Sequence, residues 1–208
     1  WEKVITREQR TLDYLTLTAQ KIVNVICDTN ELLKIDFPEL SVNLSRNMKA
    51  ITTNELEDMY PELSPREREN EISKKYGTVL IMKIGGKLKN GKPHDGRAPD
   101  YDDWELNGDI IFYNHVLERA FEISSMGIRV DEVSLDRQLS ESGCDERRAL
   151  PFHSMLLKGE LPLTIGGGIG QSRLCMLMMG SAHIGEVQSS IWDRETLDGC
   201  KAAGIRLL

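Results

Sequence analysis

The chain has 208 residues, of which 40% are hydrophobic, and its formal net charge is -7 at pH 7. This length is enough for one sizeable core, so we expect a single domain. The acidic balance argues against a nucleic-acid partner, because phosphate contacts need clustered Lys and Arg. No apolar run approaches the roughly 20 residues that span a bilayer, so no membrane partner is expected either.

The four cysteines give no sign of a disulfide framework or a metal cluster. Cys27, Cys144, Cys175 and Cys200 are scattered without a C-x-x-C pair, and no secretory segment precedes them. We therefore expect free thiols and a cytoplasmic location.

The beginning of the chain is predicted to be mainly helical. Apolar residues at helical spacing predict a long amphipathic helix over residues 7–28 that packs on a sheet. Alternation over residues 42–44 indicates a short strand. A short helix over residues 53–60 would be capped by Thr53 or Asn54.

The next helix has clear start and stop signals. Ser64 can cap it, Pro65 suits its first position and Glu67 completes a capping box, while Gly77 supplies the stop. Residues 78–84 are rich in β-formers and predict a buried strand.

An acid-rich segment follows a predicted hairpin turn. The Asn-Gly step at residues 90–91 is a turn signal, and residues 94–104 then carry four acids, an arginine and a histidine. On its own, such a cluster is more typical of a solvated acidic loop than of a binding site.

Two further strands are predicted over residues 109–114 and 120–130. If they pair as an antiparallel hairpin, Asp109 and Glu122 face one open surface of the sheet. Two carboxylates there repel each other unless a cation or a positive substrate group lies between them. In a nucleotide-binding enzyme that cation would be magnesium. Strand alternation places Arg129 on the other face unless the preceding Met-Gly step turns it inward.

Residues 131–142 and 147–158 are predicted to be helices that flank the sheet, and residues 183–192 to be a last strand. The positions predicted to be buried in the two helices are Leu135, Leu139, Phe152, Met155 and Leu156.

The stretch at residues 164–173 (TIGGGIGQSR) is unusually rich in glycine. Bare backbone of this kind lets a flat or negatively charged group approach closely. The stretch lacks the lysine and hydroxyl of a Walker loop, and the third glycine of the dinucleotide pattern would fall on Arg173. What remains is a strand end, a turn and a helix start carrying Arg173. A tight connection explains this pattern as well as a ligand site does.

Taken together, these segments resemble one family. The glycine stretch with Arg173 is similar to the third signature motif of class II aminoacyl-tRNA synthetases. Five runs look, in the right order, like ammonia-dependent asparagine synthetase, that is, aspartate-ammonia ligase: residues 83–88, 97–104, 106–110, 121–130 and 164–174. The resemblance extends over nearly the whole chain.

The resemblance implies an α+β fold of the class II synthetase type, with an antiparallel sheet flanked by helices. Residues 1–208 would be the C-terminal portion of one catalytic domain, and the protein would be a homodimer. The implied reaction converts L-aspartate, ATP and ammonia into L-asparagine, AMP and pyrophosphate, with Mg2+. Because a carboxylate is a poor electrophile, the aspartate would first become β-aspartyl-AMP, which ammonia then attacks. No glutaminase domain is visible, so free ammonia is the expected donor.

Matched position by position, the resemblance implies an ATP site and an aspartate site. The ATP site would comprise Asp109, Glu122, Gly166, Gly167, Gly168 and Arg173, with Asp109 and Glu122 holding Mg2+. The aspartate site would comprise Asp102, Ser124, Ser125 and Arg129. Asp102 would engage the α-ammonium group, and Arg129 would form a fork with a carboxylate that discriminates against neutral analogues. Asp102 and Arg173 are the expected catalytic residues.

The match has two gaps. The family carries a substantial part before the segment that resembles residues 1–4, and a longer glycine-containing loop near residues 104–106. If the polypeptide is no longer than this sequence, we expect weak or no ligase activity and a damaged dimer interface.

Two other classes of protein stay open. A non-catalytic relative that binds nucleotide or amino acid is disfavoured because the charged site residues are all present. An aminoacyl-tRNA synthetase core is disfavoured by the acidic balance and by the lack of an appended anticodon-binding domain. Formation of asparagine without tRNA would separate the ligase from both.

Overall fold

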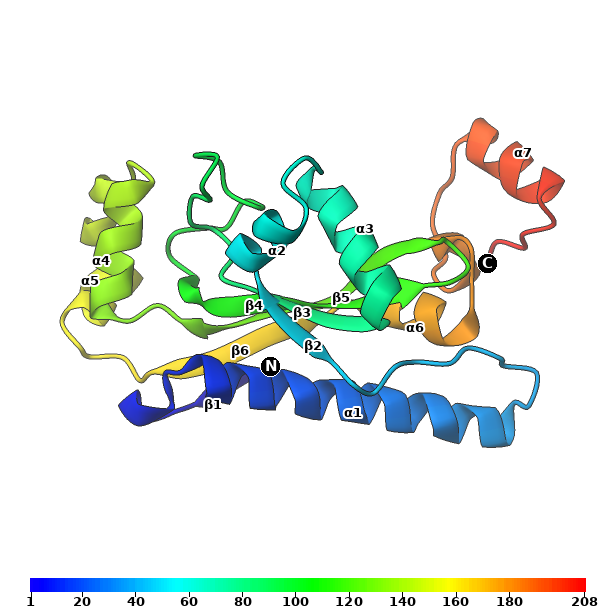
Figure 1. The fold of residues 1–208 in the computed structure, drawn as a ribbon, viewed down its shortest axis with the longest axis horizontal. Coiled ribbons are helices and arrows are strands. Elements are labelled where there is room, and N and C mark those ends of the chain that lie inside the picture. The colour runs from blue at the N-terminus through cyan, green and yellow to red at the C-terminus, as the bar shows by residue number, and fades with distance from the viewer.

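The computed structural model describes all residues 1–208 and contains one six-stranded sheet with helices on both faces (Figure 1). The strands are β1 (Glu2–Val4), β2 (Lys49–Thr52), β3 (Thr78–Met82), β4 (Asp102–Asn114), β5 (Arg119–Arg129) and β6 (Thr164–Ile169). Their order is β1-β6-β5-β4-β3-β2, and only the β2–β3 pair is parallel. The α+β class is confirmed, and edge strand β2 is the exception to the antiparallel arrangement.

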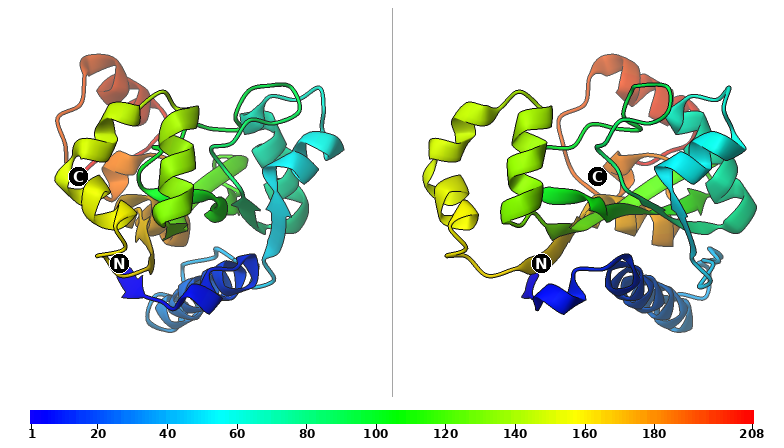
Figure 2. Two further views of the ribbon diagram at one scale, coloured as in Figure 1. Left: turned by 90° about the vertical axis from the view of Figure 1, so that its left-hand side faces the viewer. Right: turned by 60° about the vertical axis from the view of Figure 1, so that its left-hand side comes forward.

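Seven α-helices surround the sheet: α1 (Leu12–Asp36), α2 (Thr53–Met59), α3 (Pro65–Tyr76), α4 (Glu132–Glu141), α5 (Pro151–Leu157), α6 (Gln171–Met179) and α7 (Arg194–Ala202). Helix α1 runs along one face of the sheet, while α2 and α3 lie over part of the other (Figure 1). Helices α4 and α5 stand at one end, so that α2–α3 and α4–α5 frame the open part of that second face (Figure 2). None of the helices combines the length and the apolar composition needed to cross a membrane.

The main core lies between α1 and the sheet. Helix α1 contributes Leu15, Ala19, Val23 and Ile26, which pack against buried residues of the central strands and of α6. A smaller apolar cluster joins α2 and α3 to the other face of β3 and β4. The face that carries no long helix is therefore covered only in part, and polar side chains gather there.

Local chemistry explains the elements that were predicted correctly. Ser64 accepts a hydrogen bond from the Glu67 N–H, the Glu67 carboxylate accepts one from the Ser64 N–H, and Gly77 ends α3 at a φ of 77°. Strand β5 also matches the prediction, and a strand followed by helix α6 is confirmed, but Gly166, Gly167 and Gly168 lie within β6 and not in the predicted turn. Helix α1 starts later than predicted because Thr11 caps it, and it runs on to Asp36.

Several other predictions need correction. Residues 42–44 form no strand, because this segment is tied to α1 through the Asn30 amide, which donates to the Val42 carbonyl at 3.0 Å. Residues 183–192 form no strand either; His183 caps a short 3-10 helix there. Thr52, not Thr53 or Asn54, caps α2. Helix α4 agrees with the prediction, whereas the second helix begins later, at Pro151, after a separate 3-10 turn.

The burial predictions for the helices at the end of the sheet were partly right. Leu135, Leu139 and Leu156 are buried. Phe152 and Met155 are exposed instead, because α5 is short and buries only the side that carries Leu156, against α4 and neighbouring residues.

The acid-rich segment is only in part the solvated loop that its composition favours: residues 94–101 form a loop, but the end of the segment does not. Strand β4 begins at Asp102, so this acid and Asp103 enter the sheet, where they are only 4% and 6% exposed. Buried carboxylates require positive partners. Arg129 contacts Asp102, and Arg10 pairs with Asp103 at 2.8 Å.

Candidate active site

The open face of the sheet presents one continuous row of functional side chains. Strand register places Asp109 opposite Ser125, and Ser125 opposite Gly168. Gly127 lies between Asn107 and Gly166 on the neighbouring strands. Because side chains alternate between the faces of a sheet, Asp109, Ser125 and every second residue of β5 beyond it face the same side.

A β-bulge decides which residues of β5 join this row. Ser124 pairs with Ile110 but Glu122 pairs with Ile111, so Ile123 is the extra residue. The bulge reverses the alternation, and Glu122 and Arg129 therefore share a face. The irregularity needed to bring Arg129 inward lies here and not at residues 126–127, where pairing is regular.

Arg129 is the centre of a dense ionic cluster at one end of the row. Its guanidinium contacts the Asp102 carboxylate, and its Nη2 donates to Glu2 at 2.8 Å and to the Tyr101 hydroxyl at 3.0 Å. The guanidinium carbon also stacks 3.9 Å from the centre of the Tyr101 ring. Burial raises the pKa of Asp102 above its usual value, although the charge of Arg129 acts against this shift. The cluster thus offers an arginine fork and a carboxylate side by side.

Two glycines make room for this cluster. A Cβ at Gly127 would lie 2.5 Å from Cγ of Asp102, and one at Gly166 would collide with the Glu2–Arg129 pair. A side chain at either position would push the charged groups apart. These glycines are therefore required by close approach and not by backbone conformation.

The crowding at Gly127 gives a first prediction. Gly127→Ala should lower the free energy of unfolding by about 1–3 kcal/mol, because the added methyl overpacks a side chain that Arg129 holds in place. Gly168→Ala is the matched control on the next strand, since a Cβ there meets nothing within 4 Å. Denaturant unfolding of both variants measures the difference. Equal stabilities would contradict the geometry.

Asp109 occupies the middle of the row and pairs with Arg97. Burial raises the pKa of Asp109 to about 6, although Arg97 acts in the opposite direction. Oδ1 of this carboxylate is buried and has no hydrogen-bond partner. A buried carboxylate oxygen without a donor is a position that a cation would satisfy. The structure contains no group of three or more His, Cys, Asp or Glu arranged to hold a metal ion by themselves.

Arg173 lies at the other end of the row, in the first turn of α6. Its Nη1 donates to the Glu122 carbonyl at 3.2 Å and lies 3.5 Å from the Glu122 carboxylate. A cavity of about 500 Å³ opens here, within the usual size range of small-molecule sites. It is lined by Tyr101, Glu122, Ile123, Ser125, Gly168, Gly170, Gln171, Ser172, Arg173, Ile184 and Gln188. The cavity therefore extends from the ring that stacks on Arg129 to the start of α6.

The structure brings most of the predicted site residues to this face. Asp102, Asp109, Glu122, Ser125, Gly166, Gly168, Arg129 and Arg173 all lie along it. Ser124 does not: it is 1% exposed, pairs with Ile110 and Ile169, and turns toward the α1 side. Gly167 also belongs to the α1 side, opposite Met126.

Three site residues were missed by sequence reasoning. Arg97 neutralises Asp109, Tyr101 stacks on Arg129, and Glu2 forms an ion pair with Arg129. Arg97 and Tyr101 lie inside the acid-rich segment, whose unusual charge was the available signal. Glu2 had no local signal, because its partner is 127 positions away.

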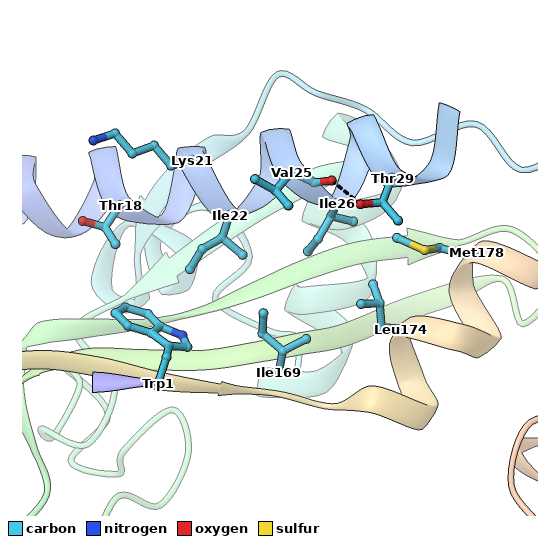
Figure 3. Close-up of a pocket in the computed structure, with 10 residues that line it drawn as sticks. All are labelled: Trp1, Thr18, Lys21, Ile22, Val25, Ile26, Thr29, Ile169, Leu174 and Met178. Atoms are coloured by element: carbon cyan, nitrogen blue, oxygen red, sulfur yellow. Dashed lines mark hydrogen bonds between the residues drawn. The ribbon is translucent and has the colours of Figure 1, made fainter. Parts of the chain in front are cut away.

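A second cavity of about 390 Å³ lies on the opposite face, between α1, β6 and α6 (Figure 3). Most of its lining is apolar, and Lys21 points away from it (Figure 3). The hydroxyls of Thr18 and Thr29 donate to carbonyl oxygens of α1 itself. Lys21 is the one charged side chain in its lining, and the cavity holds no cluster of charged groups like the one on the other face.

The arrangement of strands and helices is shared with solved aminoacyl-tRNA synthetases. Asparaginyl-tRNA synthetase from Entamoeba histolytica superposes with a TM-score of 0.57 and 16% identity, over 88% of this chain and 44% of that one. Asparaginyl-tRNA synthetase from Pyrococcus horikoshii, solved with asparaginyl-adenylate, gives a TM-score of 0.58 and 15% identity over the same shares. The chain therefore has the fold of the class II synthetase core.

Sequence comparison identifies the family within this class. The family model described as aspartate-ammonia ligase matches residues 1–204, and the chain belongs to this family. Aspartate-ammonia ligase from Lactobacillus acidophilus is 57% identical over all of this chain, and that from Fusobacterium nucleatum is 52% identical. The chain spans 62% and 64% of the length of these two relatives.

Proposed function

We propose that the protein makes L-asparagine from L-aspartate, ATP and ammonia, releasing AMP and pyrophosphate. The observation that carries this proposal is the cavity that extends from Tyr101, whose ring stacks on Arg129, to Arg173. An arginine–carboxylate pair lies at one end, and a glycine strand followed by an arginine lies at the other. The end near Arg129 suits an amino acid with an extra carboxylate, and the end near Arg173 suits a nucleoside triphosphate.

The aspartate end is built for a zwitterion. Asp102 and Arg129 contact each other, so an incoming α-ammonium group can take the place of Arg129 beside Asp102. A substrate carboxylate can take the place of Asp102 on the fork. Ser125 lies on the same face and contributes a hydroxyl to the floor, whereas the buried Ser124 supports the strand from behind.

The nucleotide end combines open backbone with charge. Gly168 leaves open space above β6, which lets a flat adenosine lie against the strand. Arg173 is half exposed and free to turn from Glu122 toward a phosphate. Arg97 supplies a second positive charge along the row. These two arginines would stabilise the negative charge that develops when the β-carboxylate attacks the α-phosphorus.

The residues present fit a magnesium ion. The unpartnered Oδ1 of Asp109 and the carboxylate of Glu122 are oxygen ligands of the type that Mg2+ prefers. Two carboxylates are enough, because the phosphate oxygens of ATP would supply further ligands to the ion. When bound, the ion would neutralise phosphate charge. Asp109 and Glu122 would hold and orient it, and Arg97 would then be released from Asp109 to bind the phosphates.

Catalysis proceeds in two steps. The aspartate β-carboxylate, held by Arg129, attacks the α-phosphorus and expels pyrophosphate, giving β-aspartyl-AMP. Free ammonia then attacks the activated carbonyl carbon, AMP leaves, and the nitrogen loses its extra proton to solvent or to a nearby carboxylate. Positioning in the row and electrostatic stabilisation supply the acceleration. As in the family, a homodimer is the proposed assembly.

An activity assay tests this proposal. The protein, expressed from its complete reading frame, should release AMP and asparagine from aspartate, ATP, magnesium and ammonium without tRNA. The Lactobacillus acidophilus relative serves as positive control. No product, with ATP binding retained, would instead indicate a non-catalytic nucleotide-binding relative.

Arg173→Ala is expected to lower AMP and asparagine formation by roughly 100-fold or more, because one phosphate-stabilising charge is lost. Steady-state kinetics with varied ATP measures the effect. Arg194→Ala is the matched control, since Arg194 is 85% exposed and pairs only with Asp198. An unchanged rate in Arg173→Ala would remove this arginine from the mechanism.

A further inference from the structure

The segment that follows Asp102 is only irregularly paired in the sheet. Strand β4 pairs with β5 at Asp102–Arg129 and resumes at Asn107–Gly127, so residues 103–106 lie opposite Ile128 alone. The regular ladder of backbone hydrogen bonds is broken in this interval. Asp102 itself is held at the end of β5, where Arg129 contacts its carboxylate and the Val130 N–H donates to the Tyr101 carbonyl at 3.0 Å, but the backbone just after it needs contacts from outside the β4–β5 pair.

Gln138 supplies those contacts. Its Nε2 donates to the carbonyl oxygens of Pro99 and Asp102, at 2.9 Å and 3.1 Å, and its Oε1 accepts from the Trp104 N–H at 2.9 Å. The residue is 0% exposed. One side chain thus fixes the backbone before, at and after Asp102 and uses both of its amide donors to do so.

Gln138 is also tied to the strand that carries Arg129. Its helix, α4, begins directly after β5, where Asp131 caps it by accepting from the Ser134 N–H at 2.9 Å. Arg10 stabilises the connection between β5 and α4, because it pairs with Asp131 at 3.1 Å and donates to the Arg129 carbonyl at 2.6 Å. Helix α4 therefore links the backbone of Asp102 rigidly to that of Arg129.

We propose that Gln138 is a positioning residue that sets Asp102 relative to Arg129, and thereby the selectivity for a substrate with an ammonium group beside its carboxylate. This inference rests on the proposed function. Gln138 is too deeply buried to touch substrate, so it acts through the backbone of Asp102. Its loss should weaken recognition of the ammonium group more than recognition of carboxylates or of ATP.

The test uses Gln138→Met, which preserves length and removes all three hydrogen bonds. We expect the KM for aspartate to rise about tenfold, while the KM for ATP changes by less than about twofold. Succinate has both carboxylates but no ammonium group, and its inhibition constant should also change by less than about twofold, since it makes no use of Asp102.

Gln20→Met is the matched control. Gln20 also donates to a backbone carbonyl, that of Arg46 at 2.9 Å, but it lies on α1 across the sheet. Its aspartate KM should equal that of the unmodified protein. If Gln138→Met does not fold, Gln138→Glu replaces it, because a glutamate keeps the acceptor for Trp104 and loses the paired donors; the same selective rise is expected.

An aspartate KM that stays unchanged, or that rises in step with the ATP KM and the succinate constant, would overturn the positioning role. Both results leave the ligase activity of the unmodified protein intact. A failure of the unmodified protein to form asparagine would instead overturn the proposed function.

Discussion

Arg129→Ala should lower kcat/KM for aspartate by roughly 1,000-fold, equivalent to about 4 kcal/mol of transition-state stabilisation. The change removes the fork that would hold the substrate carboxylate. It also leaves the nearly buried Asp102 and the half-buried Glu2 beside each other without a cation. We therefore expect a loss of stability of about 3 kcal/mol as well, since an unpaired buried charge is costly. Steady-state kinetics and denaturant unfolding measure the two effects.

Arg129→Lys separates the two effects. Lysine keeps the positive charge between Asp102 and Glu2, so most of the stability should return. It lacks the planar fork and cannot satisfy a substrate carboxylate and two protein carboxylates together, so activity should stay low. Arg194→Lys is the control for a generic arginine change. Normal turnover by Arg129→Lys would show that charge alone suffices and that the fork has no role.

The parts of the fold that sequence could predict are those fixed by neighbouring residues. The Ser64–Glu67 capping box and the Gly77 stop define α3 through contacts within a few positions. The succession of a strand and helix α6 also follows from neighbouring residues, although the glycine run predicted as a turn is part of β6. Such signals need no knowledge of the rest of the molecule.

The parts that sequence could not predict depend on distant partners. The bulge at Ile123 carries no turn residue, and it exists because β5 must pair with β4 and β6 at once. The end of the acid-rich segment enters strand β4 because Arg10 and Arg129, remote in sequence, neutralise Asp103 and Asp102. Glu2 joins the site only because β1 pairs with β6.

The site neutralises itself in pairs. Arg97 contacts Asp109, Arg129 contacts Asp102, and Arg173 lies near Glu122. Each pair combines a group suited to a substrate anion with one suited to a cation. Substrates that bring both charges can exchange partners with these pairs without leaving a buried charge alone. Aspartate would do so at the Arg129 pair, and ATP with magnesium at the other two.

The Asp109 pair makes this exchange sensitive to pH. Burial raises the pKa of Asp109 to about 6, and only the ionised carboxylate can hold a cation. Activity at limiting MgATP should therefore increase with pH, with a midpoint near 6, because kcat/KM reports the ionisation of the free enzyme. Asp109→Asn should lose most of this activity at every pH. A profile that is flat from pH 5 to pH 8 would contradict the assignment.

Ionisation of Asp109 should lower the free energy of unfolding as the pH rises, whereas it increases activity. Since the folded protein keeps the proton on Asp109 to a higher pH than the unfolded chain, its contribution to stability is fully present below about pH 4 and is lost as pH rises toward 6. Two pKa units correspond to about 3 kcal/mol. In Asp109→Asn this component is absent, while Arg97 keeps Asp95 as a partner at 3.2 Å. We therefore expect the free energy of unfolding of the unmodified protein to fall, relative to that of Asp109→Asn, as the pH rises from 4 to 7. Denaturant unfolding of both proteins across this range measures the change. If the free energies of unfolding of the two proteins changed with pH in parallel, Asp109 would have an ordinary pKa. The proposed cation site would then lose the support of a buried carboxylate.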